Sequence, residues 1–201
     1  MNPINSFDDL LKFVDQKTNQ KVLMHSCCGP CSSACMTVLN KGLKVDIFFS
    51  NSNMDTVDEF IKRSEEQIRI NKELNKDGKV IIDPYNPDDF NQAILGLEHL
   101  GEKSYRCYKC YEMRMERSAK FAKENGYDFF TTTLSLSPHK NSDWVNEIGQ
   151  KLSEKYQIPF LYSNFKKQNG YQKSIEYSKE YNLYRQNYCG CKYSKEERGL
   201  E

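Results

Sequence analysis

The stretch "KVLMHSCCGPCSSAC" (residues 21–35) joins a short apolar run to four cysteines. Its first part, residues 21–26, has the length and the apolar character of a buried strand. Cys27 and Cys28 follow that strand directly, and ligand sites in open α/β sheets form just beyond the carboxyl ends of strands. We therefore expect these two thiols to lie where an α/β fold usually places its chemistry.

The same kind of apolar run recurs along the chain and alternates with helical patterns. Runs with strand character cover residues 44–50, 79–85, 128–134 and 159–165. Helical patterns cover residues 56–75, 87–100, 107–126, 142–157 and 170–182. Such alternation predicts an α/β fold in which helices flank a parallel sheet, here followed by a cysteine-rich C-terminal segment. A chain of 201 residues suits one domain.

Overall charge indicates no partner, because 29 Lys and Arg stand against 28 Asp and Glu. Residues 155–195 differ, with eight Lys or Arg, two acids and many tyrosines. This stretch is either a solvated helical face or a surface for a nucleic-acid backbone. The first 20 residues lack the pattern of a signal peptide, and no apolar run reaches the length of a membrane span. We therefore expect a cytoplasmic protein without membrane association.

Thiols stay reduced in the cytoplasm, so eight cysteines favour metal or redox chemistry over structural disulfides. The first group is Cys27, Cys28, Cys31 and Cys35. If a helix begins near Pro30, Cys31 and Cys35 are one turn apart, and we expect Cys35 to face the core. We expect the adjacent pair to suit the separated irons of a cubane cluster better than one tetrahedral zinc, because neighbouring side chains diverge.

The second group is Cys107 and Cys110, a C-x-x-C pair that is typical of metal ligands and of thiol redox sites. Together with Cys27 and Cys28 it supplies four thiolates, enough for a [4Fe–4S] cluster or a zinc ion. We expect Arg106 and Lys109 beside these thiols to lower their pKa.

The third group is Cys189 and Cys191, which flank a glycine. A disulfide across this C-x-C pair would close a strained ring, and strained disulfides are the easily reduced, catalytic kind. A second pair of metal ligands is the alternative. His139 follows the fourth expected strand and is a candidate for contacting substrate. Neither G-x-x-x-x-G-K-[ST] nor G-x-G-x-x-G occurs, so no motif supports nucleotide binding.

Four segments resemble the motif set of the QueH-type epoxyqueuosine reductases. They are "HSCCGPC" (25–31), "RCYKCYEMRMERSAKFA" (106–122), "FFTTTLSLSPHKNSD" (129–143) and "YRQNYCGC" (184–191). They stand in the family's order and at similar spacing. The resemblance implies one catalytic α/β domain over residues 21–201, with residues 1–20 as an N-terminal extension. It implies a Rossmann-like sheet similar to that of the adenine-nucleotide hydrolases.

The resemblance also implies a reaction and its cofactors. Such enzymes reduce epoxyqueuosine at the wobble position of tRNA to queuosine, without cobalamin and with electrons from a donor of unknown identity. The family pattern implies a [4Fe–4S] cluster on Cys27, Cys28, Cys107 and Cys110. It implies a redox-active disulfide between Cys189 and Cys191. It further implies a second metal, iron, beside the cluster, with Cys31 as a candidate ligand.

Three rival functions remain open from the residues alone. An ATP-dependent tRNA-modifying enzyme would need a phosphate loop after the first strand, and "SCCGPCSS" (26–33) lacks the usual run of glycine and serine. A zinc-stabilised RNA-binding module would hold zinc and no iron. A plain thiol oxidoreductase would need no metal. The cluster hypothesis requires that Cys27 and Cys28 converge with Cys107 and Cys110.

Overall fold

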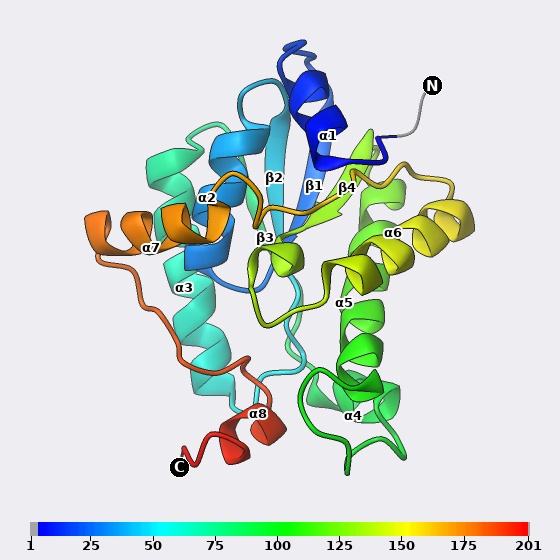
Figure 1. Ribbon diagram of the computed structural model, residues 1–201, viewed down its shortest axis with the longest axis vertical. Coiled ribbons are helices and arrows are strands. Elements are labelled where there is room, and N and C mark those ends of the chain that lie inside the picture. Colours follow the sequence, from blue (N-terminus) through cyan, green and yellow to red (C-terminus); the bar gives the residue numbers. More distant parts are fainter. Residues whose placement is uncertain (1–3, 201) are drawn as a thin grey trace.

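The computed structural model describes residues 4–200 and contains a four-stranded parallel sheet (Figure 1). The strands are β1 (Lys21–Ser26), β2 (Lys44–Phe49), β3 (Val80–Ile82) and β4 (Phe129–Thr132), in the order β3-β2-β1-β4. The helices are α1 (Phe7–Val14), α2 (Gly29–Leu39), α3 (Val57–Leu74), α4 (Pro87–Ala93), α5 (Tyr105–Glu124), α6 (Ser142–Tyr156), α7 (Gly170–Glu180) and α8 (Lys192–Glu196). A short 3-10 turn, η1 (Thr133–Leu136), follows β4.

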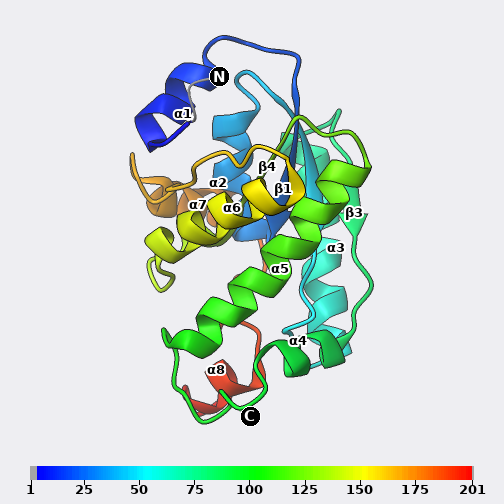
Figure 2. The same ribbon diagram turned by 90° about the vertical axis from the view of Figure 1, so that its right-hand side faces the viewer.

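Side chains that alternate along the strands build two hydrophobic layers. Val22 and Met24 of β1 enter one layer together with apolar residues of α1, α2 and α7. Leu23 between them enters the opposite layer, which α5 and α6 cover. Figures 1 and 2 show α5 and α6 on the side of the sheet opposite α7. The expected α/β class, with helices on both faces of a parallel sheet, is confirmed.

The fifth expected strand, residues 159–165, is wrong. Only Phe160 forms a bridge, to Phe130 of β4. Beyond it, the Asn146 side chain accepts a hydrogen bond from the Ser163 N–H and donates one to the Ser163 carbonyl, each at 2.9 Å. A side chain from α6 therefore satisfies the backbone groups that a strand would present to its neighbour.

Two helices differ from the sequence expectation. The helix expected over residues 87–100 ends at Ala93, and Gly96 shortly after it has a φ of +80° that a helix does not allow. Helix α1 was not expected, but the Ser6 side chain accepts a hydrogen bond from the Asp9 N–H at 3.1 Å and caps it. Phe7 and Leu10 of α1 are buried in the same core cluster as Val22.

The sheet order positions the site. β1 lies between β2 and β4. After β1 the chain continues toward the β2 side of the sheet, and after β4 it continues on the opposite side. This switch point is where open α/β sheets bind ligands. Two expectations stay predictions: the likeness to adenine-nucleotide hydrolases, and the boundary between an extension of residues 1–20 and a domain of residues 21–201. Residues 1–3 and 201 lie outside the described residues. Within residues 4–200, every helix is too short or too polar to cross a bilayer.

Candidate functional site

The cysteines of the first group surround the start of α2. β1 ends at Ser26, Cys28 is the N-cap of α2 and Pro30 lies in its first turn. The Sγ atoms of Cys27 and Cys28 are 3.8 Å apart, and the Sγ atoms of Cys27, Cys28 and Cys31 all lie within 4.8 Å of one another. Three thiols therefore meet at the carboxyl edge of the sheet.

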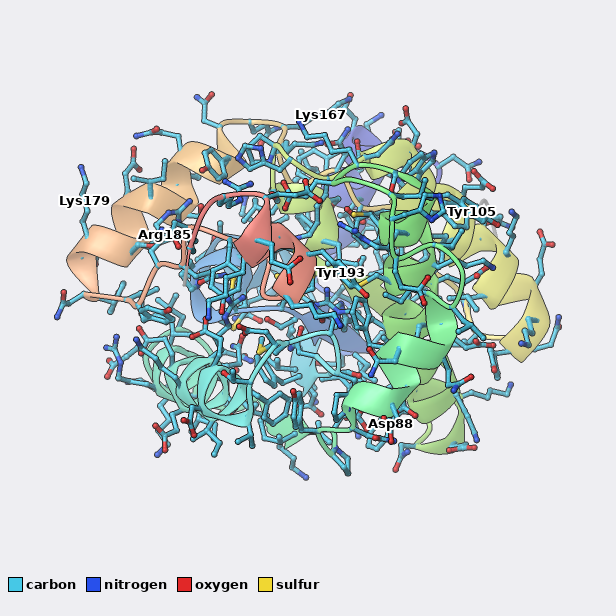
Figure 3. All side chains as sticks on the ribbon, turned by 90° about the horizontal axis from the view of Figure 1, so that it is seen from below. Asp88, Tyr105, Lys167, Lys179, Arg185 and Tyr193 are labelled. Carbon is cyan, nitrogen blue, oxygen red and sulfur yellow. The ribbon has the colours of Figure 1, made fainter. Side chains whose placement is uncertain are left out.

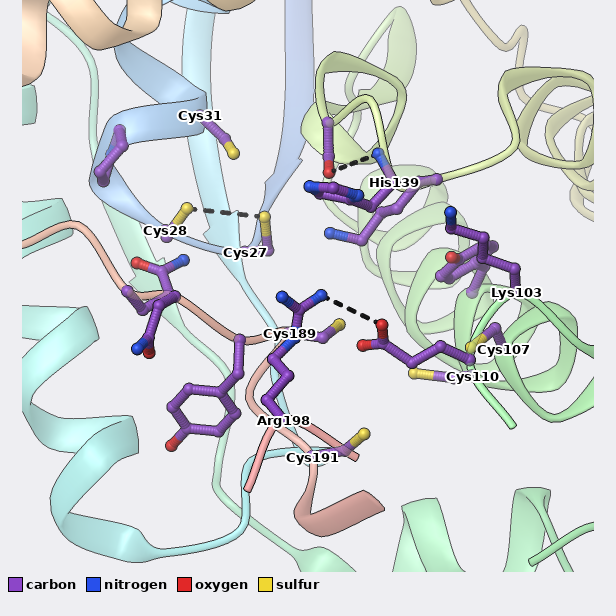
Figure 4. A pocket seen from close by; sticks show the side chains of 18 of the residues that line it. Cys27, Cys28, Cys31, Lys103, Cys107, Cys110, His139, Cys189, Cys191 and Arg198 are labelled. Atoms are coloured by element: carbon purple, nitrogen blue, oxygen red, sulfur yellow. Dashed lines mark hydrogen bonds and ion pairs between the residues drawn. The ribbon is translucent and has the colours of Figure 1, made fainter. Parts of the chain in front are cut away.

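The other thiols reach the same place from distant parts of the chain. Cys107 and Cys110 lie three residues apart near the N-terminus of α5, so they share one face of that helix. Cys189 and Cys191 lie on the segment that leads into α8. Figure 4 shows these four side chains facing Cys27, Cys28 and Cys31 across one pocket.

This pocket is a cavity of about 220 Å³. The cysteines that line it are Cys27, Cys28, Cys31, Cys107, Cys110, Cys189 and Cys191. Cys35 is absent from the lining and is fully buried in the core, as expected from its place on α2. Cys107 and Cys110 line the same cavity as Cys27 and Cys28, but the group of sulfur atoms within 4.8 Å of one another contains Cys27, Cys28 and Cys31 alone among the cysteines of residues 4–200. Their roles as ligands stay predictions.

One expectation about the adjacent pair is wrong. We expected neighbouring thiols to diverge, but Cys27 and Cys28 point the same way, 3.8 Å apart. Around one tetrahedral zinc, with Zn–S bonds of roughly 2.3 Å, thiolate sulfurs stand about 3.8 Å apart. Both residues lie in the connection between the end of β1 at Ser26 and the start of α2 at Gly29, outside the regular strand. The spacing of Cys27 and Cys28 therefore suits either a single metal ion or a cluster.

The electrostatics of the cavity favour thiolate at Cys27. Hydrogen bonds from the thiols of Cys28 and Cys31 outweigh burial and lower the pKa of Cys27 well below its usual range, and the charge of Lys140 contributes to the same effect. The thiolate of Cys27 in turn raises the pKa of Cys28 to about 11. Helices α2 and α5 both begin at the cavity, and helix N-termini favour negative charge. The structure therefore favours one thiolate, Cys27, beside the protonated thiols of Cys28 and Cys31.

The expected lowering of the pKa of the second pair is present only as a minor contribution, because the charge of Arg106 lowers the pKa of Cys107 but burial outweighs it. Arg106 is paired with Glu197 at 3.0 Å, and Lys109 with Glu112 at 2.6 Å. Burial is the largest influence on both thiols, and it raises the pKa of Cys107 and raises that of Cys110 to about 12. A metal ion would have to displace these protons, as metals do on binding cysteine.

His25, the residue before Ser26, is a structural group. Its Nε2–H donates to the Ser50 carbonyl at 3.1 Å, so its Nδ1 accepts from the Thr132 hydroxyl at 2.8 Å. Burial and the charge of Arg114 lower the pKa of His25 to about 3. The ring is therefore neutral, and both nitrogens are in use. His139, in contrast, is exposed and lines the cavity.

Two cations near the thiols were not anticipated from the sequence, a buried arginine on α5 and a lysine of the cavity lining. Arg114 is 1% exposed, and its Nη1 has no hydrogen-bond partner. Lys140 lines the cavity. Neither is part of an ion pair with a carboxylate in residues 4–200. A thiolate-bound metal centre would supply the negative counter-charge that neither cation finds in a carboxylate. The cysteines and the cations near them therefore fit such a centre.

The signal for Arg114 was present in the sequence, because Arg114 follows Cys110 by one helical turn and Cys107 by two. Its burial could not be read from that spacing. Tyr111 lines the cavity from the same face of α5. Burial raises its pKa, so the phenol stays protonated there.

Comparison with known proteins agrees with the geometry. A family model described as "Epoxyqueuosine reductase QueH" matches residues 22–197. The epoxyqueuosine reductase QueH of Staphylococcus aureus is 37% identical over 187 residues, which cover 90% of this chain and 78% of that protein. The protein of the same name from Acinetobacter baylyi is 39% identical over 177 residues, 87% of this chain and 80% of its own.

A third relative matches over nearly its whole length. The epoxyqueuosine reductase QueH of Thermotoga maritima is 35% identical over 180 residues, which cover 88% of this chain and 91% of that protein. The matched region contains every cysteine that lines the cavity. The chain therefore belongs to the QueH family of epoxyqueuosine reductases.

Proposed function

We propose that this chain is an epoxyqueuosine reductase, an oxidoreductase that converts epoxyqueuosine in tRNA to queuosine. The observation that carries the proposal is the cavity at the sheet's carboxyl edge, where cysteines from the family's three cysteine motifs meet. Removing the epoxide oxygen as water takes two electrons and two protons. The site must therefore deliver electrons singly or in pairs and protonate the departing oxygen.

Cys27, Cys28, Cys107 and Cys110 would hold a [4Fe–4S] cluster, and Cys31 would contribute to a second metal, iron, beside it. When bound, a cluster passes single electrons, and a metal with an open position acts as a Lewis acid toward oxygen. The short spacing around Cys31 supports the second site, because the Sγ atoms of Cys27, Cys28 and Cys31 lie within 4.8 Å of one another.

Cys189 and Cys191 would supply the electron pair. Their oxidation to a disulfide breaks two S–H bonds, forms one S–S bond and releases two electrons and two protons, which balances loss of the epoxide oxygen as water. Both are free thiols in the structure. Gly190 between them has a φ of +116°, a conformation that glycine adopts without strain. An external donor must then reduce the disulfide, because each turnover consumes one dithiol.

The segment that carries these two thiols is held from both sides. The Cys189 N–H donates to the Ser194 hydroxyl at 3.0 Å, and Arg63 donates to the Cys189 carbonyl at 3.3 Å. The Gly190 carbonyl accepts from the Asp55 N–H at 2.8 Å. These bonds keep Cys189 beside the cavity, where electron transfer needs it. Cys191 packs against Cys110 in an adjoining hydrophobic cluster.

We propose that tRNA binds over the mouth of the cavity. Exposed Lys103 and Arg185 line it together with half-buried Tyr171, and neither cation is in an ion pair within residues 4–200. Such cations contact phosphates, and aromatic rings stack on bases splayed out of a loop. Figure 3 shows Arg185 and Tyr193 on the lower face of the molecule.

We also propose that the enzyme works without cobalamin and in the cytoplasm. The seven cysteines that line the cavity are a donor set suited to an inorganic metal centre. Eight cysteines in the sequence suit a reducing compartment, which keeps thiols available for metal and redox chemistry.

The test is anaerobic purification followed by iron, zinc and sulfide analysis and incubation with tRNA that carries epoxyqueuosine. We expect a brown protein with iron and sulfide, and queuosine in the nucleoside digest when a chemical reductant is present. Tight zinc binding without iron uptake or conversion would instead favour the zinc-stabilised RNA-binding module. Conversion that requires ATP would favour the ATP-dependent rival.

A further inference from the structure

Arg114 is a buried cation with incomplete hydrogen bonding. It lies on α5 one turn after Cys110 and is 1% exposed. Its Nε donates to the Ser50 carbonyl at 3.3 Å, and its Nη2 donates to Oδ1 of Asn51. Its Nη1 has no partner. Both acceptors are neutral, so neither compensates the charge of the guanidinium.

A buried charge without a counter-charge is costly, and proteins keep one only where something offsets it. No carboxylate in residues 4–200 is paired with Arg114. Arg114 follows Cys110 by one turn of α5, so the two residues share one face of that helix. Arg114 therefore carries its uncompensated charge on the helix face that presents Cys110 to the cavity.

We infer that Arg114 is a positioning residue that holds a fixed positive charge against the thiolate metal centre, tightening metal binding and raising its reduction potential. The inference rests on the thiolate centre of the proposed function and is independent of the substrate. Four thiolates around a [4Fe–4S] core leave a net negative charge, which grows when the centre takes up an electron. A nearby cation stabilises the reduced form more than the oxidised form, and charge is among the factors that set cluster potentials.

Three variants separate charge from shape. Arg114→Gln removes the charge and keeps an amide donor, and Arg114→Lys keeps the charge. Asn51→Asp brings a carboxylate to the guanidinium without touching α5, and it also removes the hydrogen bond from Asn51 Nδ2 to the Ser26 carbonyl at 3.0 Å. Arg117→Gln is the matched control, because Arg117 lies on the same helix and is already paired with Asp83 and Asp89.

The first measurement is a redox titration of the full chain loaded anaerobically with iron and sulfide, followed by absorbance and electron paramagnetic resonance. At the wild-type midpoint, we expect the ratio of reduced to oxidised centre to fall about tenfold in Arg114→Gln and Asn51→Asp, which for one electron is about 59 mV. Arg114→Lys and Arg117→Gln should stay near wild type. Unchanged potentials in Arg114→Gln and Asn51→Asp would overturn the inference.

The second measurement is the melting temperature of the chain with and without Zn²⁺, because a bound metal stabilises the folded state by mass action. We expect the gain on adding Zn²⁺ to shrink in Arg114→Gln and Asn51→Asp and to persist in Arg114→Lys. A merely structural role would lower both melting temperatures equally and leave the gain unchanged, against the inference. If Arg114→Gln does not fold, the inference is tested by comparing the gain in melting temperature of Asn51→Asp with that of wild type. If the chain binds zinc but takes up no iron, the proposed cofactor fails, and the zinc measurement still decides the role of Arg114.

Discussion

The Sγ atoms of Cys27 and Cys28 lie 3.8 Å apart, although the two residues are adjacent in the chain. The pair can share one proton, so Cys27 has a lowered pKa and Cys28 a raised one. The same pair faces Cys107 and Cys110 across the cavity. The pair therefore belongs both to the group of three close thiols with Cys31 and to the lining of the wider cavity.

Cys110→Ser should lose most of the iron that the wild-type chain takes up. The expected cluster needs four thiolates, and a serine hydroxyl is a poorer ligand for iron. Iron and sulfide per chain, measured after anaerobic reconstitution, check this. Cys35→Ala is the matched control, because Cys35 is fully buried in the core away from the cavity. It should keep its iron, and equal iron in both variants would contradict the ligand role of Cys110.

Cys31→Ala should remove the second metal and spare the cluster. Cys31 forms a group of three close thiols with Cys27 and Cys28. It is not among the four expected cluster ligands. We expect sulfide content and cluster absorbance near ~400 nm to stay, since thiolate-to-iron charge transfer gives that band, while total metal per chain falls. Loss of the sulfide together with the metal would show that Cys31 belongs to the cluster itself.

Cys191→Ser should stop multiple turnover while the cluster absorbance stays intact. The C-x-C pair is expected to pass two electrons per epoxide, and one remaining thiol cannot form the internal disulfide. The measurement is queuosine formed per enzyme with excess tRNA and excess reductant. Sustained turnover by Cys191→Ser would remove the pair from the electron path.

Charge reversal at the mouth should weaken tRNA binding. Arg185→Glu and Lys103→Glu remove cations that line the cavity, and each lost phosphate contact should reduce the slope of log K against log salt by about 0.7–0.9. Binding measured at several salt concentrations checks this. Lys44→Glu is the control. Lys44 is exposed at the amino-terminal end of β2, whereas the cavity lies at the carboxyl ends of the strands. An equal effect of Lys44→Glu would place the tRNA elsewhere.

Asn146→Ala should destabilise the fold by about 1–3 kcal/mol, the usual cost of leaving buried hydrogen-bonding groups unpaired. The Asn146 side chain is bonded to both backbone groups of Ser163, and Ser163 is fully buried. Denaturant unfolding of metal-free protein measures the difference. Gln150→Ala, an exposed substitution on the same helix, should change stability by much less. Equal stabilities would mean that segment 159–165 is held by other contacts.

The elements that carry the cysteines were predictable because their signals are local. The apolar run before Cys27 forms β1, and the spacing of Cys107 and Cys110 places both on one face of α5. Segment 159–165 shows the limit of such signals. Its apolar run has strand character, yet Asn146, distant in sequence, takes the hydrogen bonds of Ser163. No pattern within the segment carries that information.

The sequence by itself determined the α/β class, the three groups of thiols and the family to which the chain belongs, because periodicity, spacing and motif order are properties of short segments. Only the tertiary structure decided that these groups share one cavity, that Cys27 and Cys28 point the same way, and that Arg114 is buried without a carboxylate partner. The physical reason is that burial and electrostatic pairing depend on which distant segments the strand crossovers bring together. The order of the strands, with β1 between β2 and β4, determines which of these segments meet.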